Sequence, residues 1–544
     1  MMKFAIAFAA ALMAGAAPAL AQDQGQGQGG GEAPPARGRV VQPYIEVSQI
    51  VSAEITPGSD VVTFTQVAAG ADVNIQGRNS GASVSVRYER NIAYGDDSVD
   101  SNTLSGIARG TLAVVPGALS LEAGALASRT RVDAGGGTSV NPLVREDNES
   151  RVYSAYAGPS LRTQVGDVGI EGVARVGYNR FEAEDALVTQ QGQTVDVFDD
   201  SVTYLGQVRA GVRPDTVIPG VGLAVTAGGF QEDIANLDQR VRDLYVRGDV
   251  TIPVSPTLAL VGGAGYEDVE ISSRDAVRDA NGVPVRGADG RLVTDKTAPR
   301  RIAFAVDGLL WDVGVLWRPS SRTSLQAAVG RRYDSTTYYG TFTYAPSDRS
   351  NLAINVYDGV SGLGGALNNA LAGIGTDFEA IRNPVTGDFG GLVGGSQGQS
   401  LVGVAGSVRS AAFRGRGVRA SYQRQVGRTT AAIGAGYDRR TFIAAAGTAL
   451  APLDGLRDES YYLTAGLSRQ VGAGSAITTN AYVNWFDGAG SNDVTAIGGS
   501  AAYNQTITRR LEGRAAIGVD YVDSQFTDQD FAVATALVGL RYNF

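Results

Sequence analysis

Apolar and polar residues alternate along most of the chain, in stretches separated by turn-forming residues. Successive side chains of a β-strand point to opposite faces, so a period of two predicts strands with one apolar and one polar face. The same division recurs in 83–89, 309–318 and 511–521. The pattern is clearest at the C-terminus, where alternate positions are all apolar or aromatic: Ala532, Ala534, Ala536, Val538, Leu540, Tyr542 and Phe544.

Charged residues in these stretches fall on the polar face. If the apolar face meets lipid, the polar face must line a lumen, because an arginine facing lipid at the midplane costs about 2 to 4 kcal/mol. The residues predicted in this way to line a pore are Arg87, Glu89, Asp312, Arg318, Glu512, Arg514, Asp520 and Arg541.

A soluble β-sandwich would also alternate, with its apolar face buried. Strand length, Tyr or Trp near strand ends, and the absence of the proline and charge devices that protect sheet edges favour a membrane barrel instead. A bilayer offers no water to an open sheet edge, so such a sheet must close on itself. We therefore predict an all-β protein with a single antiparallel up-and-down transmembrane barrel over residues 41–544.

Turns and loops set the topology, because one end of such a barrel has tight turns and the other has long loops. Counted back from Phe544, they alternate and place both termini on the periplasmic side, with about 22 strands and a range of about 20 to 24. Tight turns are predicted around residues 78–79, 116–117, 166–167, 255–256, 319–320, 346–347, 427, 472–473 and 509. Long extracellular loops are predicted at 132–148, 183–200, 272–300, 359–409 and 443–459.

The first residues predict export. Lys3 is followed by an apolar run and then by Ala19-Leu20-Ala21, a pattern typical of a signal peptide over residues 1–21 that is cleaved after Ala21. The apolar run is too short to cross a bilayer as a helix. Residues 22–40 are rich in Gln, Gly and Pro and predict a flexible lead-in. Together with the barrel, these features predict the outer membrane of a Gram-negative bacterium.

Composition removes several function classes. The 544 residues include no Cys and no His, so a Ser-His-Asp triad, a histidine base and a His-containing zinc site are all excluded. The formal net charge of -9 makes the protein a poor binder of nucleic acid. We expect no cofactor, no metal and no enzyme activity, with carboxylate-only chemistry in the barrel mouth as a distant alternative.

Several strand and turn segments resemble a known family across nearly the whole chain. These segments are residues 41–46, 81–90, 201–213, 266–269, 330–335 and 434–440. The family comprises outer-membrane barrels associated with exosortase (PEP-CTERM) and exopolysaccharide systems and is called β-barrel porin type 2. The resemblance implies a role in polysaccharide export or surface assembly. Some similar chains are named preprotein translocase subunit, but that name belongs to a small inner-membrane protein with one helix, which nothing here matches.

The terminal strand carries a second resemblance. Tyr542 and Phe544 end an amphipathic strand, and a terminal aromatic in this setting resembles the signal by which outer-membrane assembly machinery recognises its substrates. The partners expected for this chain are therefore that machinery, outer-membrane lipid and lipopolysaccharide, with polysaccharide as a candidate cargo.

The segment 359–409 is the main candidate for a functional element. Its Gly-rich stretches enclose a short predicted helix at 366–374, followed by Asp377, Glu379, Arg382 and Asp388. Loops of this length are uncommon unless they are functional, and a barrel of about 22 strands is wide unless something fills it. We expect the segment to turn inward as a constriction; the alternative is a mobile surface loop.

Two functions follow from this pattern. The first is a porin-like channel or conduit for hydrophilic solutes, which the family resemblance extends to exopolysaccharide export. The second is a non-conducting structural or surface-display barrel whose long loops bind partners. An energised transporter would need a plug domain before the first strand, for which residues 22–39 are too short.

Overall fold

The computed structural model describes residues 38–544 except 59, 95–101, 133–137, 140–148, 189–193, 288–290, 388, 395–400, 402–408, 489–492 and 525–529. The predicted signal peptide and most of the lead-in therefore lie outside the described residues. Twenty-two antiparallel strands form one closed ring, in which each strand pairs with its neighbours along the chain and β25 returns to pair with β1. The predicted fold and strand number are confirmed.

The first half of the ring comprises β1 (Gly38–Thr56), β2 (Val61–Gln76), β3 (Ser80–Ala93), β4 (Asn102–Val115), β5 (Leu119–Val132), β7 (Glu149–Val165), β8 (Val168–Val188), β9 (Thr194–Val212), β10 (Gly222–Ile234), β11 (Gln239–Ser255) and β12 (Leu258–Ser273). The second half comprises β13 (Arg301–Ser320), β14 (Thr323–Arg332), β15 (Ser335–Ser347), β16 (Ser350–Ser361), β19 (Phe413–Val426), β20 (Thr429–Phe442), β21 (Arg457–Gln470), β22 (Ser475–Asp487), β23 (Val494–Thr506), β24 (Leu511–Ser524) and β25 (Phe531–Asn543). A two-residue strand, β6 (Thr138–Ser139), adds to β5 outside the ring.

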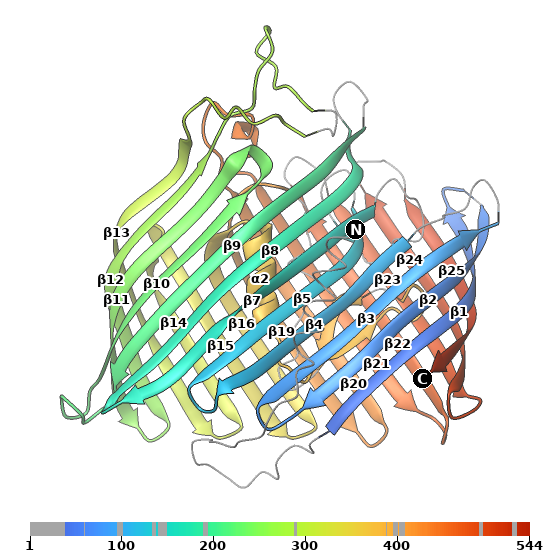
Figure 1. The fold of residues 1–544 in the computed structure, drawn as a ribbon, viewed down its shortest axis with the longest axis horizontal. Coiled ribbons are helices and arrows are strands. Elements are labelled where there is room, and N and C mark those ends of the chain that lie inside the picture. Colours follow the sequence, from blue (N-terminus) through green and yellow to red (C-terminus); the bar gives the residue numbers. More distant parts are fainter. Residues whose placement is uncertain are drawn as a thin grey trace.

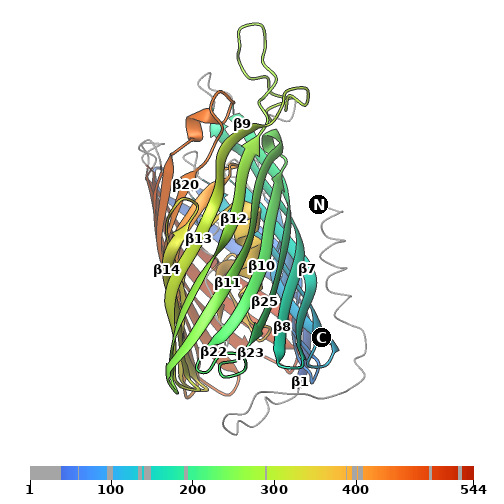
Figure 2. The same cartoon turned by 90° about the vertical axis from the view of Figure 1, so that its left-hand side faces the viewer.

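The strands are steeply tilted, and the barrel is broader in the view of Figure 1 than in the view turned by 90° in Figure 2. Its cross-section is therefore flattened. Between β16 and β19 the chain leaves the wall and forms helix α2 (Leu363–Ala372) and the small hairpin of β17 (Glu379–Arg382) and β18 (Phe389–Gly394). Within the described residues, no helix is long and apolar enough to cross a membrane.

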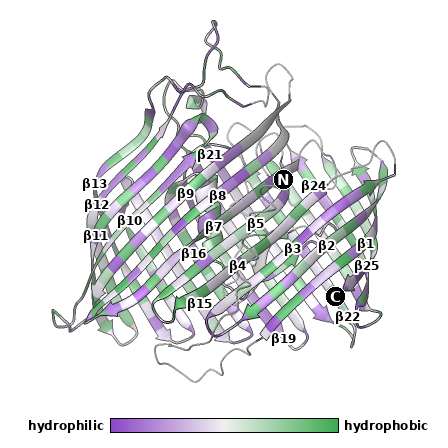
Figure 3. Cartoon of the chain, in the orientation of Figure 1, coloured by the Kyte–Doolittle hydropathy of each residue, from purple (hydrophilic) through white to green (hydrophobic). Residues whose placement is uncertain are grey.

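Burial in the barrel is the reverse of burial in a soluble protein. Large apolar side chains such as Leu309, Ile517 and Val538 are 65–68% exposed on the outer face, whereas Glu46 and Glu89 are buried inside. Figure 3 shows hydrophobic and hydrophilic residues alternating along the strands. In a closed ring, the backbone N–H and C=O groups of every strand can pair with a neighbouring strand, so no sheet edge is exposed to lipid. The protein is an outer-membrane β-barrel.

The predicted tight turns all lie at the end of the barrel where the last strand finishes. One further turn at this end, residues 213–221 between β9 and β10, is missing from the sequence prediction. The predicted loop 183–200 is wrong, because β8 continues to Val188 and β9 begins at Thr194. The physical reason is that β-pairing continues above the membrane, where charged residues are tolerated on either face. At the opposite end of the barrel, β1 begins at Gly38, before the predicted start, because Gly38 and Arg39 still pair with Gln76 and Ile75 at the end of β2.

Three loops interlock over the extracellular end. They are the turn containing the 3-10 helix η2 (Asn236–Asp238), residues 274–300, and residues 443–456, which contain the 3-10 helix η4 (Ala451–Leu453). Leu237, Ala276, Ala444 and Leu450 form an apolar cluster between them. Asp275 lies beside this cluster and accepts backbone hydrogen bonds from the N–H groups of Ala276 and Ala449, both at 2.8 Å.

The Asp275 carboxylate gives this cap a pH dependence. Burial by itself raises the pKa of Asp275, but hydrogen bonds from Arg278, Ala276 and Ala449 outweigh it and hold the pKa below its usual value. A group with a depressed folded-state pKa stabilises the fold above its unfolded pKa and loses that contribution as the pH falls through the folded value. We expect amide hydrogen exchange in residues 274–300, corrected for its intrinsic pH dependence, to rise below about pH 4.

Asp275→Asn should raise this exchange at neutral pH and remove most of the pH dependence. Asp279→Asn, at the exposed tip of the same loop, is the matched control and should leave the pH dependence in place. Equal pH profiles in wild type and Asp275→Asn would contradict the assignment.

Candidate functional site

The described residues of the segment 362–412, here called the lumen segment, fold into the barrel. Figure 1 shows α2 within the ring of strands. Its described residues contact strands on both sides of the closure: β1 to β5 and β7 to β10 on one side, and β21 and β23 to β25 on the other. The segment leaves the wall slightly later than predicted, since β16 runs to Ser361, but its helix begins earlier, at Leu363 rather than at Ala366.

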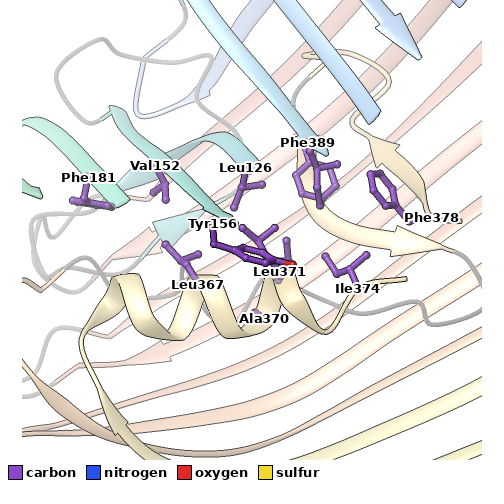
Figure 4. Close-up of a cluster of buried hydrophobic side chains, with 12 residues drawn as sticks. Leu126, Val152, Tyr156, Phe181, Leu367, Ala370, Leu371, Ile374, Phe378 and Phe389 are labelled. Atoms are coloured by element: carbon purple, nitrogen blue, oxygen red, sulfur yellow. The ribbon is translucent and has the colours of Figure 1, made fainter. Parts of the chain in front are cut away.

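An apolar face attaches α2 to one side of the wall. Leu367 and Leu371 of the helix, with Ile374 just after it, point toward apolar side chains of β5, β7 and β8 (Figure 4). Leu367, Leu371 and Ile374 are each no more than 2% exposed, and burial of one such side chain is worth about 1.5 to 3 kcal/mol. The wall residues of this cluster include Ile107, Leu126, Val152, Tyr156 and Phe181. This apolar contact is large enough to hold the helix against the wall.

Polar contacts fix the orientation of α2. The fully buried carboxylate of Glu232 on β10 accepts a hydrogen bond from the Gly362 N–H at 2.7 Å, so a wall residue satisfies a free donor at the helix N-terminus. Asn368 accepts a hydrogen bond from Ser154 at 2.8 Å and donates one to Thr203 at 2.7 Å. A Cβ on Gly177 would overlap the Asn368 amide. The helix therefore needs a glycine in β8 to dock this closely.

The part of the lumen segment after α2 is held by backbone acceptors and arginines. The Thr376 carbonyl oxygen accepts from Gln76 at 3.0 Å and from Ser83 at 2.9 Å. Arg382 donates to the Ser85 carbonyl at 3.1 Å and to the Ser105 hydroxyl at 2.9 Å. These four wall residues lie on β2, β3 and β4. The wall strands and the lumen segment therefore each satisfy hydrogen-bonding groups of the other.

The bend at residues 383–387 is buried against the strands that close the ring. The Pro384 carbonyl accepts from Arg514 on β24. Val385 is 3% exposed and packs with Ile50, Phe64 and Leu537. The lumen segment is thus attached on both sides of the β1–β25 closure.

A buried charge network lies behind this bend. Arg87 on β3 contacts Glu46 on β1 at 2.9 Å and Glu89 at 3.1 Å. Glu89 also contacts Arg129 at 3.1 Å, and Glu46 contacts Arg514 at 3.5 Å. Each of the two carboxylates is therefore shared by two arginines, and the charges alternate across the network. Pairing of this kind is required for charges that are 1–3% exposed.

A second network replaces missing backbone pairing in the wall. β15 and β16 pair only between Gly340/Val356 and Ser347/Ser350, so their extracellular halves are not joined to each other. Arg416 donates to the Thr336 carbonyl of β15 at 2.7 Å and to Asp358 of β16 at 3.1 Å. Arg414 donates to Asp358 at 2.8 Å. Side chains from β19 therefore bridge the two strands at this point.

Most of the predicted pore-lining residues lie in lumen networks. Arg87, Glu89 and Arg514 belong to the buried network described above, and Arg541 contacts Asp72 at 3.2 Å. Asp312 contacts Arg247 at 2.5 Å. Three more placements complete the set: Asp520 accepts from Tyr482 at 2.7 Å, Glu512 is half-buried, and Arg318 is exposed near a short turn.

The predicted constriction residues are spread over the lumen segment. Arg382 is bonded to the wall, Asp377 is half-buried and Glu379 is exposed. Asp388 lies outside the described residues. At the C-terminus, the Phe544 N–H donates to the Pro43 carbonyl at 3.0 Å, and the Tyr542 and Phe544 rings meet edge to face at 5.2 Å. Phe544 is exposed on the outside of the barrel.

Sequence reasoning missed several buried carboxylates of the lumen wall, of which Glu46 pairs with the predicted Arg87 and Arg514. Glu46, Glu122, Glu232, Asp243 and Glu267 are all buried in the lumen wall. Alternation could have placed Glu46 and Glu232 on the polar face of their strands. It could not have identified Glu232 as the acceptor at the N-terminus of α2, because that contact joins residues 130 apart in sequence.

The side of α2 opposite the docked face borders open space. A cavity of about 570 Å³ lies between α2 and the wall formed by β15, β16, β19 and β20. Asn369 is exposed on this side of the helix, whereas the adjacent Asn368 is buried against the other wall. Thr341 and Thr343 of β15 are exposed on the facing wall. Among the described residues, no group of three or more Asp or Glu side chains could hold a metal ion.

Comparisons with known proteins give low similarity. No family model and no curated protein matches the chain. Similar solved structures include the ferric-catecholate import receptor Fiu of Escherichia coli K12 in its closed form (TM-score 0.44, 11% identity, 92% of this chain and 81% of that chain). They also include the FrpB iron transporter of Neisseria meningitidis, F3-3 variant (0.43, 11%, 92% and 81%), and the siderophore receptor PiuA of Acinetobacter baumannii (0.41, 9%, 92% and 82%).

Proposed function

We propose that the protein is an outer-membrane channel for small hydrophilic solutes, narrowed by the lumen segment. The observation that carries this proposal is the asymmetry of the lumen. One side of α2 is docked against β5, β7, β8 and β9, while the other side borders the 570 Å³ cavity. Solutes pass along the cavity side, between α2 and the wall of β15, β16, β19 and β20. Export of exopolysaccharide is the form of this function that the family resemblance favours.

The chain contains no cysteine, so single introduced thiols test the route directly. Asn369→Cys places a thiol on the open side of α2, and Asn368→Cys places one on the docked side. We expect a membrane-impermeant, bulky thiol reagent to reduce the single-channel current of the Asn369→Cys protein in a planar bilayer. The Asn368→Cys protein is the matched control and should be unaffected, because Asn368 is buried between Ser154 and Thr203.

The results separate the two candidate functions. Absence of single-channel steps in the refolded wild-type protein would overturn the channel and favour a non-conducting structural barrel. Equal block at both positions would show that the solute route does not follow one side of α2.

A further inference from the structure

The cavity beside α2 has the size of a ligand site. Its volume of about 570 Å³ falls within the range of roughly 300–1,000 Å³ that is typical of small-molecule sites. Strands β15, β16, β19 and β20 line it on one side, and α2, which is fixed by the contacts with Glu232 and Asn368, lines it on the other. A solute entering it would therefore lie between two rigid elements.

The polar groups that line this cavity both donate and accept hydrogen bonds. Asn355 on β16 and Asn369 on α2 carry amides, each with two donors and one acceptor oxygen, and Thr341 contributes a hydroxyl that does both. Asn369 and Thr341 are exposed, and Asn355 is half-buried, so these groups are accessible from the cavity. A ligand with both hydroxyl donors and hydroxyl acceptors matches such a lining better than one with only acceptors.

One wall of the cavity is a preorganised polar cluster. Arg419 on β19 donates to Asp438 at 2.8 Å and to the Tyr357 hydroxyl at 3.0 Å, and its guanidinium lies over the Tyr357 ring at 4.5 Å. Asp438 is 4% exposed. Within the part of the chain that the structure describes, Asp438 Oδ2 and Arg419 Nε are buried without a hydrogen-bond partner. A buried carboxylate oxygen and a guanidinium N–H without partners are costly unless a ligand or water satisfies them.

One aromatic ring completes the accessible lining. Tyr357 borders the cavity and is half-buried, whereas the neighbouring Phe413 is 3% exposed and lies beneath Arg440 at 4.8 Å. Flat rings pack against the C–H faces of a sugar ring, while amide and carboxylate groups bond to its hydroxyls in the ring plane. The charged residues that line the cavity are Arg419, Arg440, Asp358 and Asp438, so two positive and two negative charges balance and give no strong preference for an ionic ligand.

From this lining we infer that the cavity binds a polyhydroxylated solute, an oligosaccharide of about two or three sugar units. The inference rests on the proposed function, because it identifies the substrate class of the same passage. It adds that the passage holds its solute at a defined position between α2 and β16 rather than passing all hydrophilic solutes alike.

Isothermal titration of the refolded full-length protein tests this binding without requiring conduction. The detergent must lack a sugar headgroup, which would compete. Maltotriose, cellotriose and raffinose serve as probes, and a polyethylene glycol of similar mass serves as a control that accepts but hardly donates hydrogen bonds. We expect at least one trisaccharide to bind saturably at about millimolar concentration and the glycol not to bind.

Asn355→Ala/Asn369→Ala should weaken trisaccharide binding about tenfold, because two hydrogen bonds to the solute are lost. Asn480→Ala, on β22 outside the cavity, is the matched control and should bind like wild type. No saturable binding of any of the three trisaccharides, equal binding of the glycol, or equal weakening by Asn480→Ala would each overturn the inference. Trisaccharide binding without single-channel current would support this binding site and overturn the proposed channel. Single-channel current without trisaccharide binding would support the channel and overturn the binding site.

Discussion

Replacing residues 362–412 with the dipeptide Asn-Gly is expected to raise the single-channel conductance several-fold. Ser361 and Phe413 are direct partners in the β16–β19 ladder, so a two-residue turn of this type can join them. All 22 strands and their pairings remain. A ring of this size encloses a wide aqueous lumen once nothing fills it. The measurement is the current through the refolded variant in a planar bilayer, compared with wild type.

The matched control removes a long loop that does not enter the lumen. Ser273 and Arg301 are also direct ladder partners, so residues 274–300 can be replaced with Asn-Gly in the same way. This variant should keep the wild-type conductance. Unchanged conductance after removal of the lumen segment would show that the segment does not limit passage.

The same deletion should lower the stability of the barrel. It exposes Leu126, Val152 and Phe181 to water in the lumen, where each is now covered by the lumen segment. Samples are heated to increasing temperatures and then run on a detergent gel. The temperature at which the band of the folded protein disappears should be lower for this variant than for wild type. This readout is independent of the current, so a loss of folding can be told apart from a loss of conduction.

The second large effect is expected at Arg87. Arg87→Met leaves Glu46 and Glu89, which are only 1–2% exposed, without their shared cation. Removing one partner of a buried ion pair typically costs about 3 to 5 kcal/mol, because the remaining charge is neither solvated nor paired. Arg129 and Arg514 still reach the two carboxylates, so we expect the lower part of this range. Urea unfolding followed by tryptophan fluorescence measures it.

Arg162→Met provides the contrast. Arg162 contacts Glu171 at 3.1 Å, but its side chain is 82% exposed, and exposed pairs contribute about 0 to 1 kcal/mol. A cost of Arg87→Met no larger than that of Arg162→Met would contradict a structural role for the network.

The fold could be predicted from the sequence because the membrane enforces a simple rule at every strand. Residues such as Leu540 and Tyr542 must face lipid, so the intervening Arg541 must face the lumen, and this alternation is visible without knowledge of any partner strand. The rule fails where the membrane ends. Residues 183–188 and 194–200 carry charges and were predicted as loop, yet they continue β8 and β9 as paired strands.

The candidate site could be predicted only in part. Arg87 and Glu89 were identified from their own strand, but Glu46 joins them through the β1–β2–β3 ladder, which requires the register of both pairings. The inward course of the lumen segment was expected from its length, yet its anchors are single contacts across long separations. Arg382 with Ser85 and Gly362 with Glu232 are examples, and no local pattern in the sequence marks either pair.

The closure between β1 and β25 also governs how the barrel can form. Ser52 and Thr535 face each other across it, 483 residues apart in sequence. Until the final strand arrives, the growing sheet has two free edges, and each would be exposed to hydrocarbon if insertion began early. Closure is therefore the slowest kind of contact to make, since it spans almost the entire chain. A second protein that covered both free edges until β1 and β25 pair would lower the barrier to closure. To do so, it would have to bind the C-terminal strand β25.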